Sequence, residues 1–181
     1  MKLRQIFTLF ITLLMLFSIT CPAAAATSRT AQESSQLLYN LGLFRGTGTN
    51  KDGTPIFDLD RAPTRAEAIT MLVRLMGGEK AAQSSTWKTP FTDVPAWAKP
   101  YVGYAYSKGY TNGSNLQLGI FGSNDPVTAE QYMTFLLRAL GYKDGTDFTW
   151  SSPWNLTNKL GITSKAYPSS YKFLRGDVAV T

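Results

Sequence analysis

The chain has no histidine, and Cys21 is the only cysteine among its 181 residues. The lack of histidine excludes Ser-His-Asp triads and metal sites built on imidazole. Charged residues make up only 17% of the chain, and no basic run interleaved with aromatic residues predicts a nucleic-acid surface. We therefore expect no nucleic-acid partner, no cofactor and no metal site.

The first 26 residues have the three parts of an export signal. Lys2 and Arg4 come first, residues 9–17 are apolar, and residues 23–26 are small alanines. The apolar run is too short for an ordinary membrane span, so we expect no stable span once residues 1–26 are removed. The formal charge of +6 would then fall to +4, because two basic residues leave. A mildly basic exported chain meets acidic wall polymers more readily than nucleic acid.

Cys21 lies inside this expected signal. It would be a lipoprotein cysteine only if the residues before it fitted, and Thr20 and Ser18 fit poorly. We therefore expect it to leave with the signal. The remainder is expected to be globular, since hydrophobic residues make up 44% of the chain.

A capped helix organises the rest of the chain. Thr64 and Glu67 have the spacing of a capping box, in which each side chain bonds the other residue's backbone amide. Apolar residues follow at helical spacing, and Gly77 supplies a stop. The pattern predicts a buried helix from Thr64 to about Met76.

The same pattern returns further along the chain, which indicates an internal repeat. Thr128 and Gln131 take the places of Thr64 and Glu67, and an apolar stripe again follows. A third, degenerate copy has Arg175 at the motif position and Leu174 at the cap position, and it stops at Thr181. We expect its helix to be short, either because the record is truncated or because the copy continues in a longer protein.

The expected fold is mainly α, with three helix–loop–helix units packed as a pseudo-threefold bundle and the third unit truncated. The expected units cover residues 28–79, 90–143 and 147–181. Units of this size bury too little apolar surface alone, so they must pack on one another. Further segments are expected as a helix at 32–43, a loop at 45–62, a linker at 77–89, a helix starting at Asp93 or Pro95, and a helix within 148–161. In the first of these helices Leu37, Leu38 and Leu41 are expected to face inward, and in the last the expected apolar positions are Trp150, Trp154, Leu156 and Leu160.

Three features together resemble the S-layer homology family. They are Phe91-Thr92-Asp93-Val94 with Trp97-Ala98, a Gly-x-x-x-Gly loop, and Thr64-Arg65-Ala66-Glu67. The resemblance covers most of residues 28–181. It implies a three-part helical domain that holds exported proteins to the bacterial cell surface by binding a secondary cell-wall polysaccharide, often pyruvylated, in grooves between neighbouring units.

By this resemblance Arg65 would bind the carboxylate of the polysaccharide, and Arg175 would take the same place in the third unit. A guanidinium makes paired bonds to a carboxylate, and a helix N-terminus adds positive potential. The second unit has Ala129 at the motif position, so at most two grooves should bind in the family manner. Asp93 and Trp97 are further candidates for ligand contact.

Each candidate also has a structural reading. Thr64, Glu67, Thr128 and Gln131 are expected to be caps rather than ligand contacts. Trp97 is more often a core anchor, and Asp93 is equally a helix cap or a groove partner. Arg65 and Arg175 could be exposed helix residues without a ligand.

A glycosidase would need two carboxylates. The nearest pair, Asp58 and Asp60, lies in an expected turn beside Pro63, where aspartate is common for structural reasons. We therefore expect a non-catalytic module located at the cell wall or cell surface. Two alternatives stay open: a protein–protein assembly module of the cell surface, and a targeting module of a longer wall-active enzyme.

Overall fold

The computed structural model describes residues 29–181, so the expected signal peptide lies outside the described residues. The fold is mainly helical, as the sequence predicts, with seven helices and one two-stranded sheet in the described part. The elements, in chain order, are α2 (Ala31–Asn40), β1 (Gly48–Thr49), β2 (Pro55–Ile56), α3 (Arg65–Leu75), α4 (Glu79–Gln83), α5 (Lys99–Ser107), α6 (Ala129–Ala139), α7 (Trp154–Lys159) and α8 (Arg175–Val180). No helix in this described part is long and apolar enough to span a bilayer.

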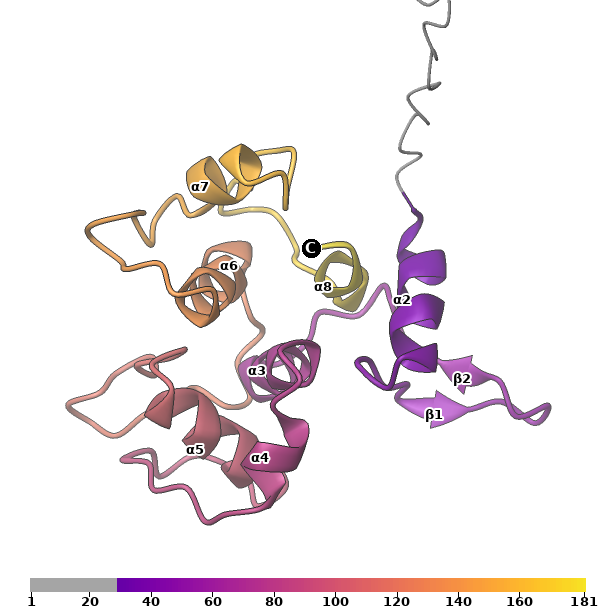
Figure 1. Ribbon diagram of the computed structural model, residues 1–181, viewed down its shortest axis with the longest axis horizontal. Helices are drawn as coiled ribbons and strands as arrows, with labels where there is room; N and C mark the ends of the chain where they lie inside the picture. Colours follow the sequence, from indigo (N-terminus) through magenta and orange to yellow (C-terminus); the bar gives the residue numbers. More distant parts are fainter. Residues whose placement is uncertain (1–28) are drawn as a thin grey trace, which may run out of the picture.

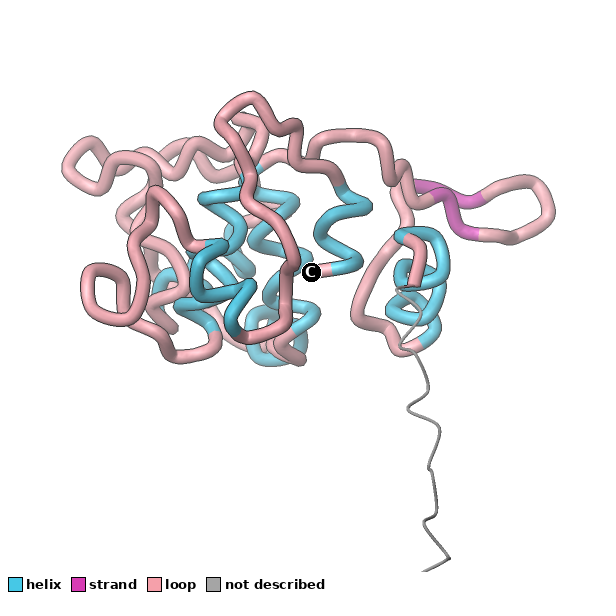
Figure 2. The backbone as a smooth tube through the Cα atoms, turned by 90° about the horizontal axis from the view of Figure 1, so that it is seen from above, coloured by secondary structure: helices cyan, strands magenta, loops and turns pink. Residues whose placement is uncertain are grey.

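Three helices lie in the middle of the molecule, the helices α2, α5 and α7 lie outside them, and the short helix α4 packs beside α5 (Figure 1). α3, α6 and α8 are central. The outer helix α2 packs against α8, α5 packs against α3, and α7 packs against α6. Each outer helix therefore packs on a central helix of a different sequence unit. Long loops gather at one end of the helices, and the β1–β2 hairpin projects sideways there (Figure 2).

The central helices begin at the caps that the sequence predicts. The Glu67 amide donates to Thr64 Oγ1 at 3.2 Å, and the Thr64 amide donates to Glu67 Oε2 at 2.9 Å. Thr128 and Gln131 make the same pair of bonds at 3.3 and 3.2 Å. Most of the apolar stripe behind each cap is buried, including Ile69, Leu72, Val73, Met133 and Leu137, but the last positions, Met76 and Leu140, are 38% and 45% exposed.

α8 begins without a hydroxyl cap, because Leu174 occupies the cap position. The Asp177 carboxylate instead accepts from the Leu174 amide at 2.8 Å, so only one side of the box is a true side-chain bond. Asp177 Oδ1 also accepts from the Tyr171 hydroxyl at 2.7 Å. The Asp177 amide, whose hydrogen bond a threonine cap would accept, donates to Leu174 O at 3.0 Å, and the Tyr171 hydroxyl holds the Asp177 carboxylate in place.

Several segment predictions were wrong in detail. The loop expected at 45–62 contains the β1–β2 hairpin, with Gly48 opposite Ile56 and Thr49 opposite Pro55. The linker expected at 77–89 contains α4. The helix expected from Asp93 or Pro95 begins only at Lys99, after the N-cap Ala98. Short elements of two to five residues have too few positions for a period to emerge, which explains why they were missed.

The expected apolar faces of the outer helices were also partly wrong. Leu37 and Leu41 were expected to face inward but are 40% and 61% exposed. Helix α7 starts only at Trp154. Trp150, which was expected on the apolar face of that helix, precedes it in the chain and is 62% exposed. Helices α2 and α7 each bury a single residue, Ser35 and Thr157. The outer helix α5 differs, because its residues 101–105 are all buried.

Candidate functional site

The N-termini of α3 and α8 are joined to neighbouring loops by the same three hydrogen bonds. Arg65 donates its backbone amide to Asp125 O at 2.9 Å and its Nε to Phe121 O at 2.9 Å, while the Ala66 amide donates to Ser123 O at 3.2 Å. Partners outside the helix satisfy amide donors that a helix start leaves free.

At the N-terminus of α8 the bonding partners are other residues, but the pattern of three hydrogen bonds is the same. The Arg175 amide donates to Arg61 O at 3.0 Å and its Nε to Phe57 O at 2.8 Å, while the Gly176 amide donates to Leu59 O at 2.9 Å. We call these two contacts the Arg65 junction and the Arg175 junction. Both arginines are buried, so the reading of them as exposed helix residues was wrong.

Three of the five N–H donors of the Arg175 guanidinium have protein partners, one of them through Nε to Phe57 O. Its Nη2 donates to Arg45 O at 3.0 Å and its Nη1 to Met71 Sδ at 3.6 Å, and its Cζ lies 5.2 Å from the Phe44 ring centroid. Burial lowers the pKa of Arg175, and the nearby Arg61 lowers it further. Even so, an arginine remains charged at neutral pH.

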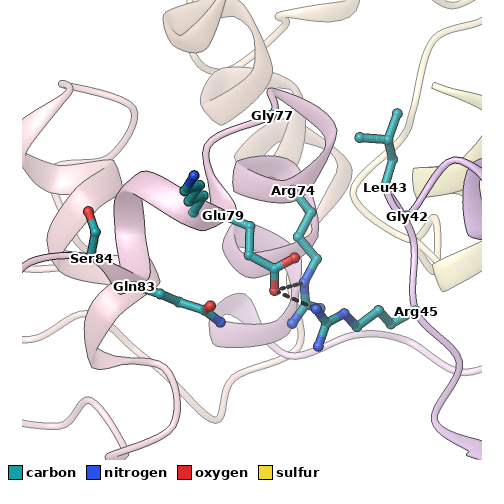
Figure 3. Close-up of a pocket in the computed structure, with 9 residues that line it drawn as sticks. Gly42, Leu43, Arg45, Arg74, Gly77, Glu79, Gln83 and Ser84 are labelled. Atoms are coloured by element: carbon teal, nitrogen blue, oxygen red, sulfur yellow. Dashed lines mark hydrogen bonds and ion pairs between the residues drawn. The ribbon is translucent and has the colours of Figure 1, made fainter.

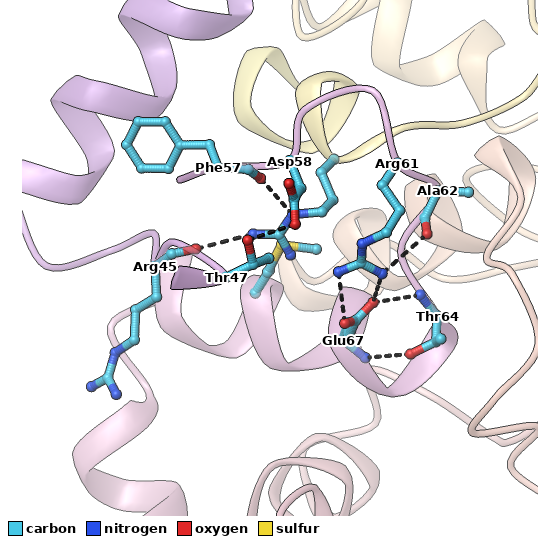
Figure 4. Close-up of polar contacts among 10 residues, drawn as sticks. Arg45, Thr47, Phe57, Asp58, Arg61, Ala62, Thr64 and Glu67 are labelled. Carbon is cyan, nitrogen blue, oxygen red and sulfur yellow. Dashed lines mark hydrogen bonds and ion pairs between the residues drawn. The ribbon is translucent and has the colours of Figure 1, made fainter. Parts of the chain in front are cut away.

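A cavity of about 350 Å³ opens beside the Arg175 junction. Its charged lining residues are Arg45, Arg61, Arg74, Arg175 and Glu67, which leaves an excess of three positive charges. Figure 4 shows that Arg61 turns toward Glu67, and the bonds from Nη1 and Nη2 measure 2.8 and 2.9 Å. This groove can therefore hold an anion.

Trp97 lines the same cavity from the start of α5 and is 53% exposed. The reading of Trp97 as a core anchor was wrong. An exposed indole beside cationic side chains offers an apolar face to a flat ligand surface, such as one side of a sugar ring. Thr70 and Thr47 line the cavity as well and add hydroxyl groups.

The Arg65 junction has different surroundings. The Arg65 Cζ lies 5.0 and 5.2 Å from the Phe121 and Phe135 ring centroids. Burial lowers its pKa to about 10, while Asp125 and Asp93 act in the opposite direction. One arginine thus faces two carboxylates, and the local charge is negative rather than positive.

Asp93 holds the loop that Arg65 contacts. Its carboxylate accepts from the amides of Phe121, Gly122 and Ser123 at 2.7, 2.7 and 3.0 Å. Burial raises the pKa of Asp93, but these three amides outweigh that effect and the pKa lies below its usual value. Asp93 is therefore not a helix cap, since Ala98 takes that position, and its carboxylate fixes a loop.

The same loop needs glycine at position 122. Gly122 has φ +79°, and a Cβ there would lie 2.7 Å from Asp125 Oδ2 and 3.3 Å from Arg65 Nε. The left-handed conformation and the close approach both exclude a larger side chain. The loop backbone is thereby pressed against the arginine.

The α6 N-terminus lacks both the arginine and its bonds. Within residues 29–181, the Ala129 amide makes no hydrogen bond to another loop. Ala129 is buried, and the nearby Tyr132 and Phe173 rings are 5.2 Å apart at their centroids. Packing of aromatic rings replaces the charged contact here.

The structure therefore brings Arg175 and Trp97 together, and it brings Arg65 and Asp93 together, but at a separate place. The sequence reasoning missed Arg45 and Arg61, which come from loops without a helical pattern. No local signal marks them, because the contact between Arg175 and the loop that they flank is made only in the folded chain. Within residues 29–181, no group of three acidic or cysteine side chains is arranged to hold a metal ion.

Comparison with known proteins places the chain among surface proteins of bacteria. It is 32% identical over 149 residues to "Cell surface protein" of Thermoanaerobacter kivui, covering 79% of this chain and 19% of that protein. It is 28% identical over 154 residues to "Middle cell wall protein" of Brevibacillus brevis, covering 81% and 14%. It is 32% identical over 125 residues to "Surface layer protein" of Brevibacillus choshinensis, covering 66% and 10%.

The chain thus spans about a fifth or less of the length of these relatives. No protein-family model matches it. The chain is a distant homologue of cell-surface, cell-wall and surface-layer proteins, and this homology indicates a structural role at the cell surface.

Proposed function

We propose that the chain is a non-catalytic anchoring module that binds an anionic polysaccharide of the bacterial cell wall. In this proposal the chain is exported and belongs to the S-layer homology type, with three pseudo-symmetric units at residues 28–79, 90–143 and 147–181. A pyruvylated secondary cell-wall polysaccharide is the ligand that the sequence resemblance implies. The homology to surface proteins is consistent with this role.

The positive cavity beside Arg175 is the observation that carries the proposal. Four arginines face one glutamate around a space of about 350 Å³, and an exposed tryptophan forms part of its wall. Arginine recognises carboxylates by paired hydrogen bonds. The ligand acid would sit among Arg45, Arg61 and Arg74, with a sugar face on Trp97.

Arg175 itself would act mainly by shaping this groove and adding charge, since its donors are largely used by protein groups. Arg65 would serve a second and weaker site. Its Nη atoms have no protein partner within residues 29–181, but Asp93 and Asp125 oppose the approach of an anion.

Co-sedimentation of the purified chain with cell-wall sacculi tests the proposal. We expect binding to intact sacculi and no binding once the secondary polymer has been extracted. Trp97→Ala should weaken binding about tenfold by removing the stacking face, and Arg61→Ala should weaken it about threefold. Both side chains are well exposed, so the variants should fold normally, which circular dichroism can check.

Lys159→Ala on α7 is the matched control, because it removes one exposed positive charge on another unit. Its binding should equal that of the parent chain. Binding that persists after polymer extraction would instead point to a protein partner, and the anchoring proposal would fail. Release of glycan fragments on incubation with sacculi would favour an enzyme.

A further inference from the structure

A second cavity lies beside the first, between the turn that follows α2 and the corner that joins α3 to α4. Its volume is about 560 Å³, and its lining includes Arg45, Arg74, Glu79, Lys80 and Gln83. Arg45 and Arg74 line both cavities, so the two spaces are neighbours that share part of their walls. In Figure 3 the Gly42–Leu43 turn faces Gln83 and Ser84 across this space.

The protein already binds one carboxylate in this second cavity. Arg74 Nε and the Tyr101 hydroxyl donate to Glu79 Oε1 at 3.0 and 2.7 Å. Arg45 Nη2 lies 3.0 Å from the same oxygen as an ion pair. Burial raises the pKa of Glu79, but these partners outweigh burial and lower it, so the group is ionised. The walls are thus suited to an anionic oxygen.

A single carboxylate does not use up the positive charge of the cavity. Arg45, Arg74 and Lys80 oppose Glu79 in this cavity. Because Arg45 and Arg74 also line the first cavity, the two cavities together have five cationic and two anionic side chains, an excess of three positive charges. Lys80 makes no side-chain hydrogen bond or ion pair within residues 29–181, and the Arg45 side chain is 58% exposed. Arginine has five N–H donors and lysine three, so most donors here are available to a ligand.

We infer that this cavity is a second anionic subsite, which takes a further carboxylate or phosphate of the same polysaccharide chain. This inference rests on the proposed function and extends it along the polymer. The first acid would lie in the Arg175 cavity, and the next would lie between Lys80 and the free side of Arg45. The glycines at 42 and 77 leave room at the wall, since a Cβ at either position would meet no atom within 4 Å.

Binding in two subsites makes affinity depend on the number of acidic groups in the ligand. The test uses two probes: polymer released from purified cell walls and fractionated by size, and a methyl glycoside that bears one pyruvate ketal. Isothermal titration of the purified chain measures both. Lys80→Ala should weaken polymer binding about threefold and Lys80→Glu about tenfold, because one and two charges are lost near the ligand. Binding of the single-acid glycoside should stay within twofold.

Lys159→Glu on α7 is the matched control for overall charge, and it should leave polymer affinity within twofold. The inference is overturned if Lys80→Glu and Lys159→Glu weaken polymer binding equally, or if Lys80→Glu has no effect while Trp97→Ala does. In that last case the anchoring proposal would stand without the second subsite. If the parent chain binds neither probe, both proposals fall.

The identity of the second acid can be read from the same titrations. Mild acid removes ketal-linked pyruvate from the polymer and leaves phosphodiesters, so the treated polymer separates the two sources. Loss of the Lys80 effect after treatment identifies a carboxylate in the second subsite. Retention of the effect identifies a phosphate.

Discussion

The Arg65 and Arg175 junctions share one backbone frame and differ in the charges around it. Both arginines start a central helix, and both donate Nε to a carbonyl of a neighbouring loop, at 2.9 and 2.8 Å. Arg65 then faces the two carboxylates of Asp93 and Asp125. The charges near Arg175 are instead mixed, with Arg61 and Arg74 positive and Glu67 and Asp58 negative. The difference teaches that the motif arginine builds the junction, and that the surrounding residues decide whether an anion is attracted.

The two junctions also differ in how many hydrogen bonds the guanidinium donates to protein carbonyl groups. Arg175 bonds two carbonyl oxygens through Nε and Nη2, while Arg65 bonds one. Arg175 is therefore the more structural of the two, even though the positive cavity lies on its side. A sequence motif alone cannot separate these two roles.

The largest expected effect is on stability. Arg175→Met should lower the free energy of unfolding by about 3 kcal/mol, because two buried carbonyls lose a charged donor. Arg65→Met should lower it by about 1–2 kcal/mol, since one carbonyl is affected. Urea unfolding followed by circular dichroism measures both, with Arg45→Met as an exposed control that should stay within about 0.5 kcal/mol. Equal losses for the two buried arginines would contradict the comparison.

A smaller effect is expected from Asp93, which fixes the acidic loop. Asp93→Asn should cost about 2 kcal/mol, because three amides lose a charged acceptor. The folded-state pKa of Asp93 is lowered, so its stabilisation is complete above the unfolded-state pKa of about 4. It is then lost as the pH falls through the lower folded-state pKa.

Thermal unfolding from pH 7 downward checks this second prediction. The gap in Tm between the parent chain and Asp93→Asn should stay constant to about pH 4 and shrink below that value. Asp125→Asn is the control, because its exposed carboxylate makes no hydrogen bond within residues 29–181. A gap that widens in acid would show that another group dominates.

Much of the helical frame could be predicted from sequence, because capping and apolar periodicity are local. Thr64 with Glu67 and Thr128 with Gln131 mark helix starts that the structure has at the same residues. The β1–β2 hairpin and α4 were missed because they are too short to carry a period. The exposure of Trp97 was missed because a tryptophan beside an apolar helix resembles a core residue until its surroundings are known.

The candidate site was predictable only in part, for a related reason. Arg175 could be found from the repeat, but Arg45 and Arg61 come from loops, and only folding brings them to the same groove. The role of Asp93 depends on loop amides almost thirty residues away in the chain. Such contacts follow from the path of the backbone, and no local pattern encodes them.

The smallest effect would be the most direct test of the charge argument. If Asp93 and Asp125 keep anions from the Arg65 junction, removing one of their charges should improve binding there. We expect Asp125→Asn to raise affinity for the wall polymer about twofold, since an exposed charge contributes little, and Asp125→Lys to raise it about fivefold. The measurement belongs in the Trp97→Ala background, where the stronger groove is weakened. An unchanged affinity in both variants would mean that shape, rather than charge, separates the two junctions.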